Sequence, residues 1–275
     1  MWTLTGFADE IDPDLDLQLE TLAEESIQHL DLRGAWGKNV LDLTDEDLAR
    51  VNEKLSAADV KVACIGSPIG KIGVEDEFAP HLERFKRAMH AADSLGAPYI
   101  RIFSFFIPEG EDPADHRGEV MDRMGALLKE AEGSEVALLH ENEKHIYGDV
   151  PSRCLDLHQQ FDTPQFRAAW DPANYVQCGV RPYTEGFDDL RPYIGYIHVK
   201  DSKLDTGEIT PAGEGDGQWP ETLASLHSSG FDGFFSLEPH LAHAGRFSGH
   251  SGPVLFRKAS SAFKDLMRAE GVEWA

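Results

Sequence analysis

Four side chains that commonly bind metal ions stand at the ends of four apolar segments in the second half of the chain. They are Glu141 after VALLH, Asp171 after FRAAW, His198 within YIGYIHVKD and Glu238 after GFFSL. The first two gaps, of about 30 residues, fit one strand, one helix and two loops, and the longer third gap includes an insertion from 202 to 218. If the segments are parallel strands, all four side chains emerge at one edge of the sheet.

One imidazole nitrogen and three carboxylates form an oxygen-rich set that suits Mn2+, Mg2+ or Co2+, and Zn2+ stays a candidate. A single carboxylate at the end of a strand is more often a helix cap or an ion-pair partner. Four such residues on successive strands are different, because unpaired charges at the inner end of a barrel strand are costly. A shared divalent cation would balance the three carboxylates.

Eight β-prone runs alternate with helical segments, and this pattern predicts a single (β/α)8 TIM barrel domain over residues 1–275. The predicted strands are 3–7, 28–32, 60–65, 99–103, 136–140, 167–170, 193–198 and 234–237. The predicted helices are 13–26, 44–58, 77–95, 113–131, 150–160, 185–191, 219–229 and 253–271. An open doubly wound sheet is the alternative, but the first turn, GFADEIDPD, has one glycine and GEGDG at 213–217 follows no strand.

Two local signals mark helix boundaries, and one helix is poorly marked. Thr44 and Asp47 resemble a capping box, and Gly96 is a typical C-terminal stop. The segment 185–191 has prolines on both sides and is compatible with a single turn.

Composition narrows the class of partner. The 275 residues are 41% hydrophobic and carry a formal net charge of −24, which disfavours nucleic acid and anionic membranes as partners. No apolar stretch reaches the roughly 20 residues of a spanning helix, and the N-terminal sequence lacks the features of a signal peptide. We therefore expect a cytoplasmic enzyme. Three widely spaced cysteines predict neither a disulfide framework nor a thiolate zinc site.

The segments ALLHEN, AAWDPAN, IHVKDSK, PAGEGDGQW and FFSLEPH, with GFADEIDP near the N-terminus, resemble the sugar phosphate isomerase and epimerase family of xylose isomerase-like TIM barrels. The similarity covers nearly the whole chain. It implies that Glu141, Asp171, His198 and Glu238 bind one divalent metal ion, and that Glu141 and Glu238 exchange the substrate proton. Glu143 shares a face with Glu141, but the E-N pair of the family aligns with Glu141 and Asn142.

This chemistry is physically reasonable. A metal that chelates a ketone oxygen and the neighbouring hydroxyl stabilises the enediolate formed when the intervening carbon loses a proton. Two glutamates on opposite faces then give epimerisation, and return of the proton to the adjacent carbon gives aldose–ketose interconversion. The expected partner is a small sugar or sugar phosphate, and a homodimer is an expectation from the resemblance.

Five further polar residues are predicted near the substrate. They are Lys200, Asn174, Arg33, Glu214 and His240. For two of them an ion pair is the competing interpretation, with Asp201 or Glu214 as the partner of Lys200, and with Asp31 or Glu10 as the partner of Arg33.

Three other functions compete with this interpretation. Metal-dependent dehydratases of the inosose or dehydroshikimate type share the fold and the ligand set, and a non-catalytic sugar-binding barrel would be expected to have lost a ligand. Abasic-site endonucleases of the same fold need additional histidines, whereas Asn174 stands where their D-x-x-H pair has one.

Overall fold

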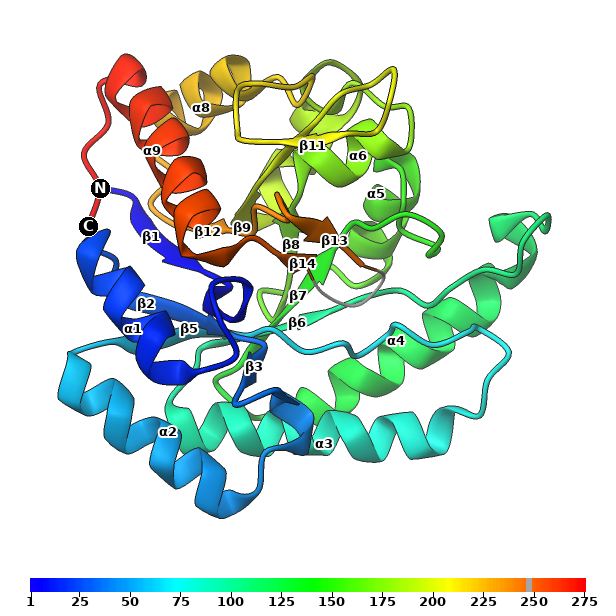
Figure 1. The fold of residues 1–275 in the computed structure, drawn as a ribbon. Coiled ribbons are helices and arrows are strands. Elements are labelled where there is room, and N and C mark those ends of the chain that lie inside the picture. The colour runs from blue at the N-terminus through cyan, green and yellow to red at the C-terminus, as the bar shows by residue number, and fades with distance from the viewer. Residues whose placement is uncertain (246–248) are drawn as a thin grey trace.

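The computed structural model describes residues 1–245 and 249–275, and its eight main strands form one parallel sheet curved into a barrel (Figure 1). The strands are β1 (Thr3–Gly6), β2 (His29–Leu32), β5 (Lys61–Ile65), β6 (Tyr99–Ile102), β7 (Ala137–Glu141), β8 (Phe166–Trp170), β9 (Ile194–Val199) and β12 (Phe234–Leu237). Their order is β1-β12-β9-β8-β7-β6-β5-β2. Every strand end lies within one residue of its predicted position.

The ring is nearly closed, because β1 and β2 are neighbours although no ladder is formed between them. Thr5 of β1 donates a hydrogen bond of 2.9 Å to Asp31 of β2 across this junction. The predicted (β/α)8 barrel is therefore confirmed, and the open doubly wound sheet is wrong.

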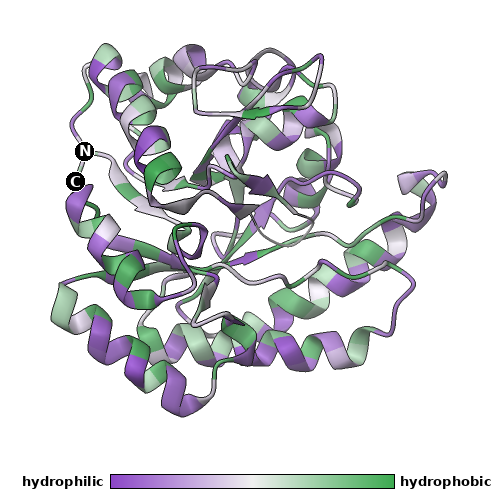
Figure 2. Cartoon of the chain, viewed as in Figure 1, coloured by the Kyte–Doolittle hydropathy of each residue, from purple (hydrophilic) through white to green (hydrophobic). Residues whose placement is uncertain are grey.

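Helices surround the barrel (Figure 1). They are α1 (Leu15–Glu24), α2 (Asp45–Ala58), α3 (Phe78–Leu95), α4 (Arg117–Ala131), α5 (Pro151–Gln160), α6 (Pro172–Gln177), α7 (Asp188–Leu190), α8 (Trp219–Ser228) and α9 (Gly252–Glu270). Hydrophobic and hydrophilic residues are interspersed along them in Figure 2, as expected for helices with one face on the strands.

Local sequence explains where several helices begin and end. Thr44 and Asp47 form the predicted capping box of α2, with mutual hydrogen bonds of 2.9 and 3.1 Å. Gly96 ends α3 in the left-handed conformation, at φ 64°. The predicted helix 185–191 is instead a π turn (Tyr183–Phe187), the one-turn α7 and a 3-10 turn (Arg191–Tyr193), which agrees with the prolines around it. The short α6 was not predicted.

Within the described residues, three two-stranded hairpins follow the carboxyl ends of barrel strands. They are β3 (Gly34–Ala35) with β4 (Lys38–Asn39), β10 (Asp201–Ser202) with β11 (Ile209–Thr210), and β13 (His243–Ala244) with β14 (Gly249–His250). Within the described ranges, no helix combines the length and apolar character needed to cross a bilayer.

The middle of the barrel contains one carboxylate among hydroxyl groups. Asp31 accepts hydrogen bonds from Thr5 at 2.9 Å, Tyr196 at 2.5 Å and Ser236 at 2.5 Å. All four residues are fully or almost fully buried. This group, the Asp31 layer, fills the barrel below its carboxyl end, because Tyr196 and Ser236 precede His198 and Glu238 by two residues on β9 and β12.

Candidate metal centre

The structure brings together the four residues predicted as metal ligands. Glu141 ends β7, Asp171 follows β8, His198 lies near the end of β9 and Glu238 follows β12. Each is at most 2% exposed, and each offers one ligand atom within 4.8 Å of those of the other three. We call this group the rim cluster.

The ligand atoms of the rim cluster surround the Nδ1 nitrogen of His198. Nδ1 lies 3.3 Å from Glu141 Oε1, 3.4 Å from Glu238 Oε2 and 3.9 Å from Asp171 Oδ2. His198 Nδ1 and Asp171 Oδ2 are buried without a hydrogen-bond partner. Buried polar atoms are rarely left in this state. One imidazole and three carboxylates with such unsatisfied atoms fit a hard or borderline divalent cation.

Asp171 has two separate roles, one for each oxygen. Oδ1 accepts a hydrogen bond of 2.9 Å from the backbone N–H of Asn174 and so caps α6, while Oδ2 faces the rim cluster. The cap interpretation and the ligand interpretation of this aspartate are therefore compatible.

Asn142 and Asn174 hold the neighbouring strand ends in place. The Asn142 side chain exchanges hydrogen bonds of 2.8 and 2.9 Å with the backbone of Asp171. The Asn174 amide donates to Glu141 Oε1 at 3.1 Å and to the Asn142 carbonyl at 2.9 Å. Asn174 therefore contacts a predicted ligand directly.

Lys200 pairs with the rim cluster rather than with either of the partners considered from sequence. Its Nζ donates to Glu238 Oε2 at 3.0 Å and lies 2.8 Å from Asp171 Oδ2. The alternative pairing with Asp201 or Glu214 is wrong, since strand alternation places Lys200 on the same face as His198.

Asp201 and Glu214 belong to the loop beside the site. The Asp201 carboxylate accepts backbone N–H groups from Ser202, Gly213, Gly215 and Gly217, at 2.8 to 3.1 Å. The GEGDG segment thus surrounds the Asp201 carboxylate with backbone N–H donors. Glu214 is exposed and lies 3.8 Å from Lys258, so the structure does not bring it to the rim cluster.

Arg33 and His240 lie on the other side of Glu238. Arg33 bonds to Asp9 at 2.8 Å and to Glu238 Oε1 at 3.2 Å, and it lies 3.8 Å from Glu10. The pairing considered with Glu10 is therefore present as a longer contact, and the one with Asp31 is wrong. His240 Nε2 lies 3.1 Å from Glu10 Oε1 and 3.5 Å from Glu238 Oε1.

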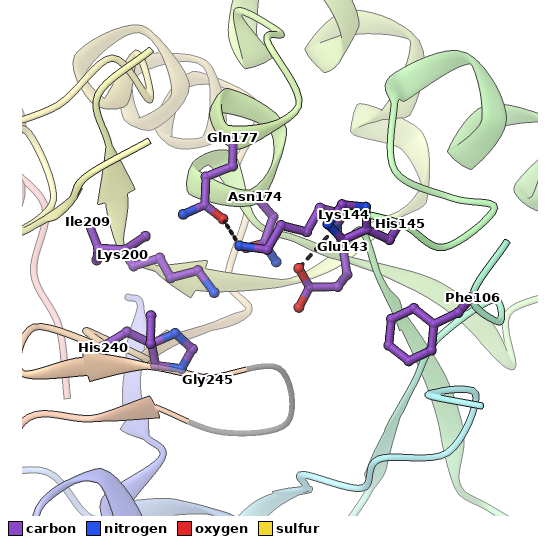
Figure 3. A pocket seen from close by; sticks show the side chains of 11 residues that line it. Phe106, Glu143, Lys144, His145, Asn174, Gln177, Lys200, Ile209, His240 and Gly245 are labelled. Atoms are coloured by element: carbon purple, nitrogen blue, oxygen red, sulfur yellow. Dashed lines mark hydrogen bonds between the residues drawn. The ribbon is translucent and has the colours of Figure 1, made fainter. Parts of the chain in front are cut away.

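A pocket opens beside the rim cluster and is lined by three of the five residues predicted near the substrate (Figure 3). These are Asn174, Lys200 and His240, which approach it from three different segments. Glu143, Phe106 and Lys144 also line this pocket. Because Glu143 Oε2 pairs with Lys71 at 3.2 Å, Glu141 and not Glu143 joins the rim cluster.

Sequence reasoning missed Arg101, an arginine that contacts both glutamates. Its Nη1 donates to Glu141 Oε2 at 3.0 Å and to Glu238 Oε1 at 3.1 Å. Lys71 and Asp9 were also overlooked. The signal available in the sequence was a single charged residue within the apolar strand YIRIF. The structure shows that this residue is buried, with 2% of its surface exposed.

Charge explains the pKa values of the rim cluster. Burial raises the pKa of Glu141, but the charges of His198 and Arg101 outweigh burial and lower this pKa to about 2. Burial lowers the pKa of His198, whereas Glu141 and Glu238 raise it to about 10. Burial raises the pKa of Asp171 to about 6, against the opposing charge of Lys200.

The permanent charges around the rim cluster do not balance. Five carboxylates face three permanent cations, an excess of two negative charges before the imidazoles of His198 and His240 are counted. Both imidazoles contact these carboxylates, and the pKa values of both are raised. The carboxylates are Asp9, Glu10, Glu141, Asp171 and Glu238, and the cations are Arg33, Arg101 and Lys200. In the absence of metal, a proton on His198 offsets part of this charge.

Comparison with known protein families and curated proteins gives matches along most of the chain. The family model described as xylose isomerase-like TIM barrel matches residues 23–266. The 2-epi-5-epi-valiolone 7-phosphate 2-epimerase of Actinoplanes sp. is 29% identical over 170 residues, 61% of this chain and 60% of that protein. The L-ribulose-5-phosphate 3-epimerase of Escherichia coli is 26% identical over 180 residues, 61% and 59% respectively. The matched region therefore spans about 60% of the length of these relatives.

Solved structures show the same fold at low sequence identity. A D-tagatose 3-epimerase-like protein has a TM-score of 0.76 at 16% identity and covers 98% of both chains. The "probable 3-DHS dehydratase AsbF" of Bacillus anthracis has a TM-score of 0.74 at 18% identity, covering 96% of this chain and 98% of its own. An IolI protein with a bound zinc atom has a TM-score of 0.76 at 14% identity, covering 98% and 99%.

Proposed function

The chain belongs to the xylose isomerase-like TIM barrel family, and from this premise we propose that it is a divalent-metal-dependent isomerase or epimerase of a small sugar or sugar phosphate. The observation that carries the proposal is the rim cluster, in which three buried carboxylates and one imidazole offer ligand atoms within 4.8 Å of one another. The curated epimerases that the chain resembles support the same class of reaction.

Glu141, Asp171, His198 and Glu238 would hold the cation. His198 Nδ1 and Asp171 Oδ2 are buried and accept no hydrogen bond, although the Lys200 ammonium lies 2.8 Å from Asp171 Oδ2. A ligand bond would engage both atoms. When bound, the divalent ion supplies Lewis acidity to the carbonyl and neighbouring hydroxyl oxygens of the sugar. The native ion in this proposal is Mn2+, Mg2+, Co2+ or Zn2+.

Glu141 and Glu238 are the proposed proton-transfer residues. They come from strands on different sides of His198, and each contacts the Nδ1 edge of that residue through one oxygen only. One carboxylate removes the proton from the carbon beside the carbonyl, and the other returns a proton to the opposite face. This exchange inverts the configuration of that carbon.

Lys200, Asn174 and His240 are the proposed sugar contacts, because they line the pocket beside the rim cluster (Figure 3). Lys200 and Asn174 also bond to the predicted ligands Glu238 and Glu141, so a bound sugar would share them with these carboxylates. Arg33 lies behind Glu238 and is fixed by Asp9. We therefore assign Arg33 to the support of Glu238 and leave Glu214 out of the substrate site.

The proposal is tested by proton exchange with solvent. Metal-loaded protein is incubated with a panel of ketoses, inososes and their phosphates in heavy water, and each sugar is examined by mass spectrometry and NMR. Deuterium at the carbon beside the carbonyl, with inversion or carbonyl migration, is the expected result. Loss of water from the same sugar would instead indicate the dehydratase, and no exchange with any of them would contradict the proposal.

Variants link this exchange to the two glutamates. Glu141→Gln and Glu238→Gln should each lower the exchange rate by about 10²- to 10⁴-fold, the usual contribution of an acid–base group. The amide keeps the shape of the side chain, so circular dichroism should show an unchanged fold. Exchange at the wild-type rate in either variant would remove that glutamate from the mechanism.

A further inference from the structure

Each glutamate of the rim cluster divides its two oxygens between different partners. Glu141 Oε1 faces His198 and accepts from Asn174, and Glu238 Oε2 faces His198 and accepts from Lys200. The remaining oxygens, Glu141 Oε2 and Glu238 Oε1, both accept from one nitrogen, Nη1 of Arg101. Glu238 Oε1 also accepts from Arg33 at 3.2 Å, so Arg101 is the arginine that joins the two glutamates. In each glutamate, one carboxylate oxygen thus faces the proposed metal position beside His198, and the other is held by the Arg101 guanidinium.

Arg101 is itself fixed from both sides. Its guanidinium carbon lies 4.6 Å from the ring centre of Phe7 and 5.0 Å from that of Phe103. Nη2 donates to the Gly66 carbonyl at 3.4 Å, and the residue is only 2% exposed. A planar cation between two aromatic rings has little rotational freedom, so it defines where the two carboxylate oxygens can lie.

We propose that Arg101 is a positioning residue for proton transfer, which holds the second oxygen of Glu141 and of Glu238 at fixed places relative to each other. This inference rests on the proposed function for its kinetic part. It has a second part that does not need the reaction. Arg101 is a positive charge on two of the ligands, so it opposes the binding of a divalent cation to them.

Loss of Arg101 should lower kcat without weakening metal binding. This combination distinguishes the inference from structural damage, which would lower both. In Arg101→Gln, kcat should fall on the order of 100-fold, as expected when reacting groups are misplaced by about 1 Å, whereas KM should change less than about threefold. The metal affinity, measured by calorimetric titration of the metal-free protein with Mn2+, should become tighter, because a repelling positive charge is removed. Damage to the rim cluster would weaken metal binding and activity together.

Arg101→Lys keeps the charge but loses the planar group. It should return the Mn2+ affinity to within about threefold of wild type and recover kcat only in part, because an ammonium is a point charge without the fixed geometry of a guanidinium. If Arg101→Gln does not fold, this variant still tests the inference: wild-type kcat would overturn it, and lowered kcat with unchanged metal affinity would support it.

Arg123 provides a matched control. It is also buried and stacked on two phenylalanines, Phe78 and Phe105, at 5.3 and 5.4 Å. It donates to Glu119 and to backbone carbonyls outside the rim cluster. Arg123→Gln should lower the melting temperature but leave kcat and Mn2+ affinity unchanged.

The outcomes distinguish this inference from the proposed function. Absence of deuterium exchange in the wild-type protein contradicts the proposed function, and the inference then depends on the titration alone. In that case, tighter Mn2+ binding in Arg101→Gln supports the second part of the inference, and unchanged binding contradicts that part. Mn2+ binding weakened more than about threefold in that variant overturns it, with or without activity in the wild type.

Discussion

The barrel interior contains two buried carboxylate groups with different environments, the Asp31 layer and the rim cluster one layer above it. In the lower layer, the Asp31 carboxylate accepts hydrogen bonds from three neutral hydroxyl groups. In the upper layer, the carboxylates are surrounded by arginine, lysine and imidazole, and His198 Nδ1 is buried without a hydrogen bond. Complete satisfaction by neutral donors indicates a structural role, whereas excess charge with unsatisfied atoms indicates a binding site.

The two layers are built from the same strands, so the difference is one of position. β9 contributes Tyr196 to the lower layer and His198 to the upper one, and β12 likewise contributes Ser236 and then Glu238. A spacing of two residues keeps both side chains on the inner face. Substitutions in matching positions can therefore separate chemistry from support of the fold.

The largest expected contrast is between Asp171→Asn and Asp31→Asn. Asp171→Asn removes one ligand charge but keeps an oxygen that can cap α6. We expect its Mn2+ affinity to fall by more than the roughly 10- to 100-fold typical of changes around a metal site. Asp31→Asn should change this affinity less than about threefold. Calorimetric titration of both variants measures the contrast, and equal losses would show that the two layers act as one unit.

Metal removal should give the next largest effect. A ligand at 100 times its Kd stabilises a folded protein by about 2.7 kcal/mol, which for a chain of this size corresponds to about 5–10 °C in melting temperature. Chelation with EDTA should therefore lower the melting temperature by this amount in wild type and in Asp31→Asn. The shift should be absent in Asp171→Asn. A chelator-insensitive wild type would argue against a bound cation.

The pH dependence of stability should distinguish Asp31 by its sign. Burial raises the pKa of Asp31 above its usual value of 3.8, although its hydrogen bonds to Ser236 and Tyr196 lower it. The folded state thus holds this proton more tightly than the unfolded chain, so the associated stability is lost as pH rises through the raised pKa. The free energy of unfolding of wild type relative to Asp31→Asn should decrease in urea titrations as the pH rises above the usual aspartate pKa of 3.8. An increase with pH would contradict the assignment.

The smallest effect is expected at Glu214, which lies outside both layers. Its carboxylate is half-exposed and lies 3.8 Å from Lys258. Glu214→Gln should change the free energy of unfolding by less than about 0.5 kcal/mol and should leave KM for the sugar unchanged. A KM raised more than tenfold would place the 202–218 loop over the pocket and restore the prediction made from sequence.

The sequence was sufficient for the barrel and for the four residues that meet at its carboxyl end. Alternation of strands and helices fixes which residues end on one edge, and parallel strands then bring these ends together. The path of a loop has no such periodicity. Glu214 was assigned to the site because of its motif, whereas the glycine N–H groups on either side of it turn toward Asp201.

The ion-pair partners of the buried cations could not be predicted from the sequence either. The partners of Lys200 and Arg33 depend on which side chains lie across the barrel, and the nearest acidic residues in sequence were mostly wrong. Arg101 was overlooked because a single charge inside an apolar strand has no spacing pattern. Its position on β6 becomes informative only when β7 and β12 are placed around the same ring.

The double role of Asp171 has a consequence for how this family diverges. Selection can retain an aspartate here for the helix cap alone, so its presence in another sequence does not report a metal ion. His198 Nδ1 has no such second task, since its contacts among the described residues are with the carboxylates of the rim cluster itself. In a relative that binds no metal ion, the histidine should therefore be replaced first and the aspartate should be retained.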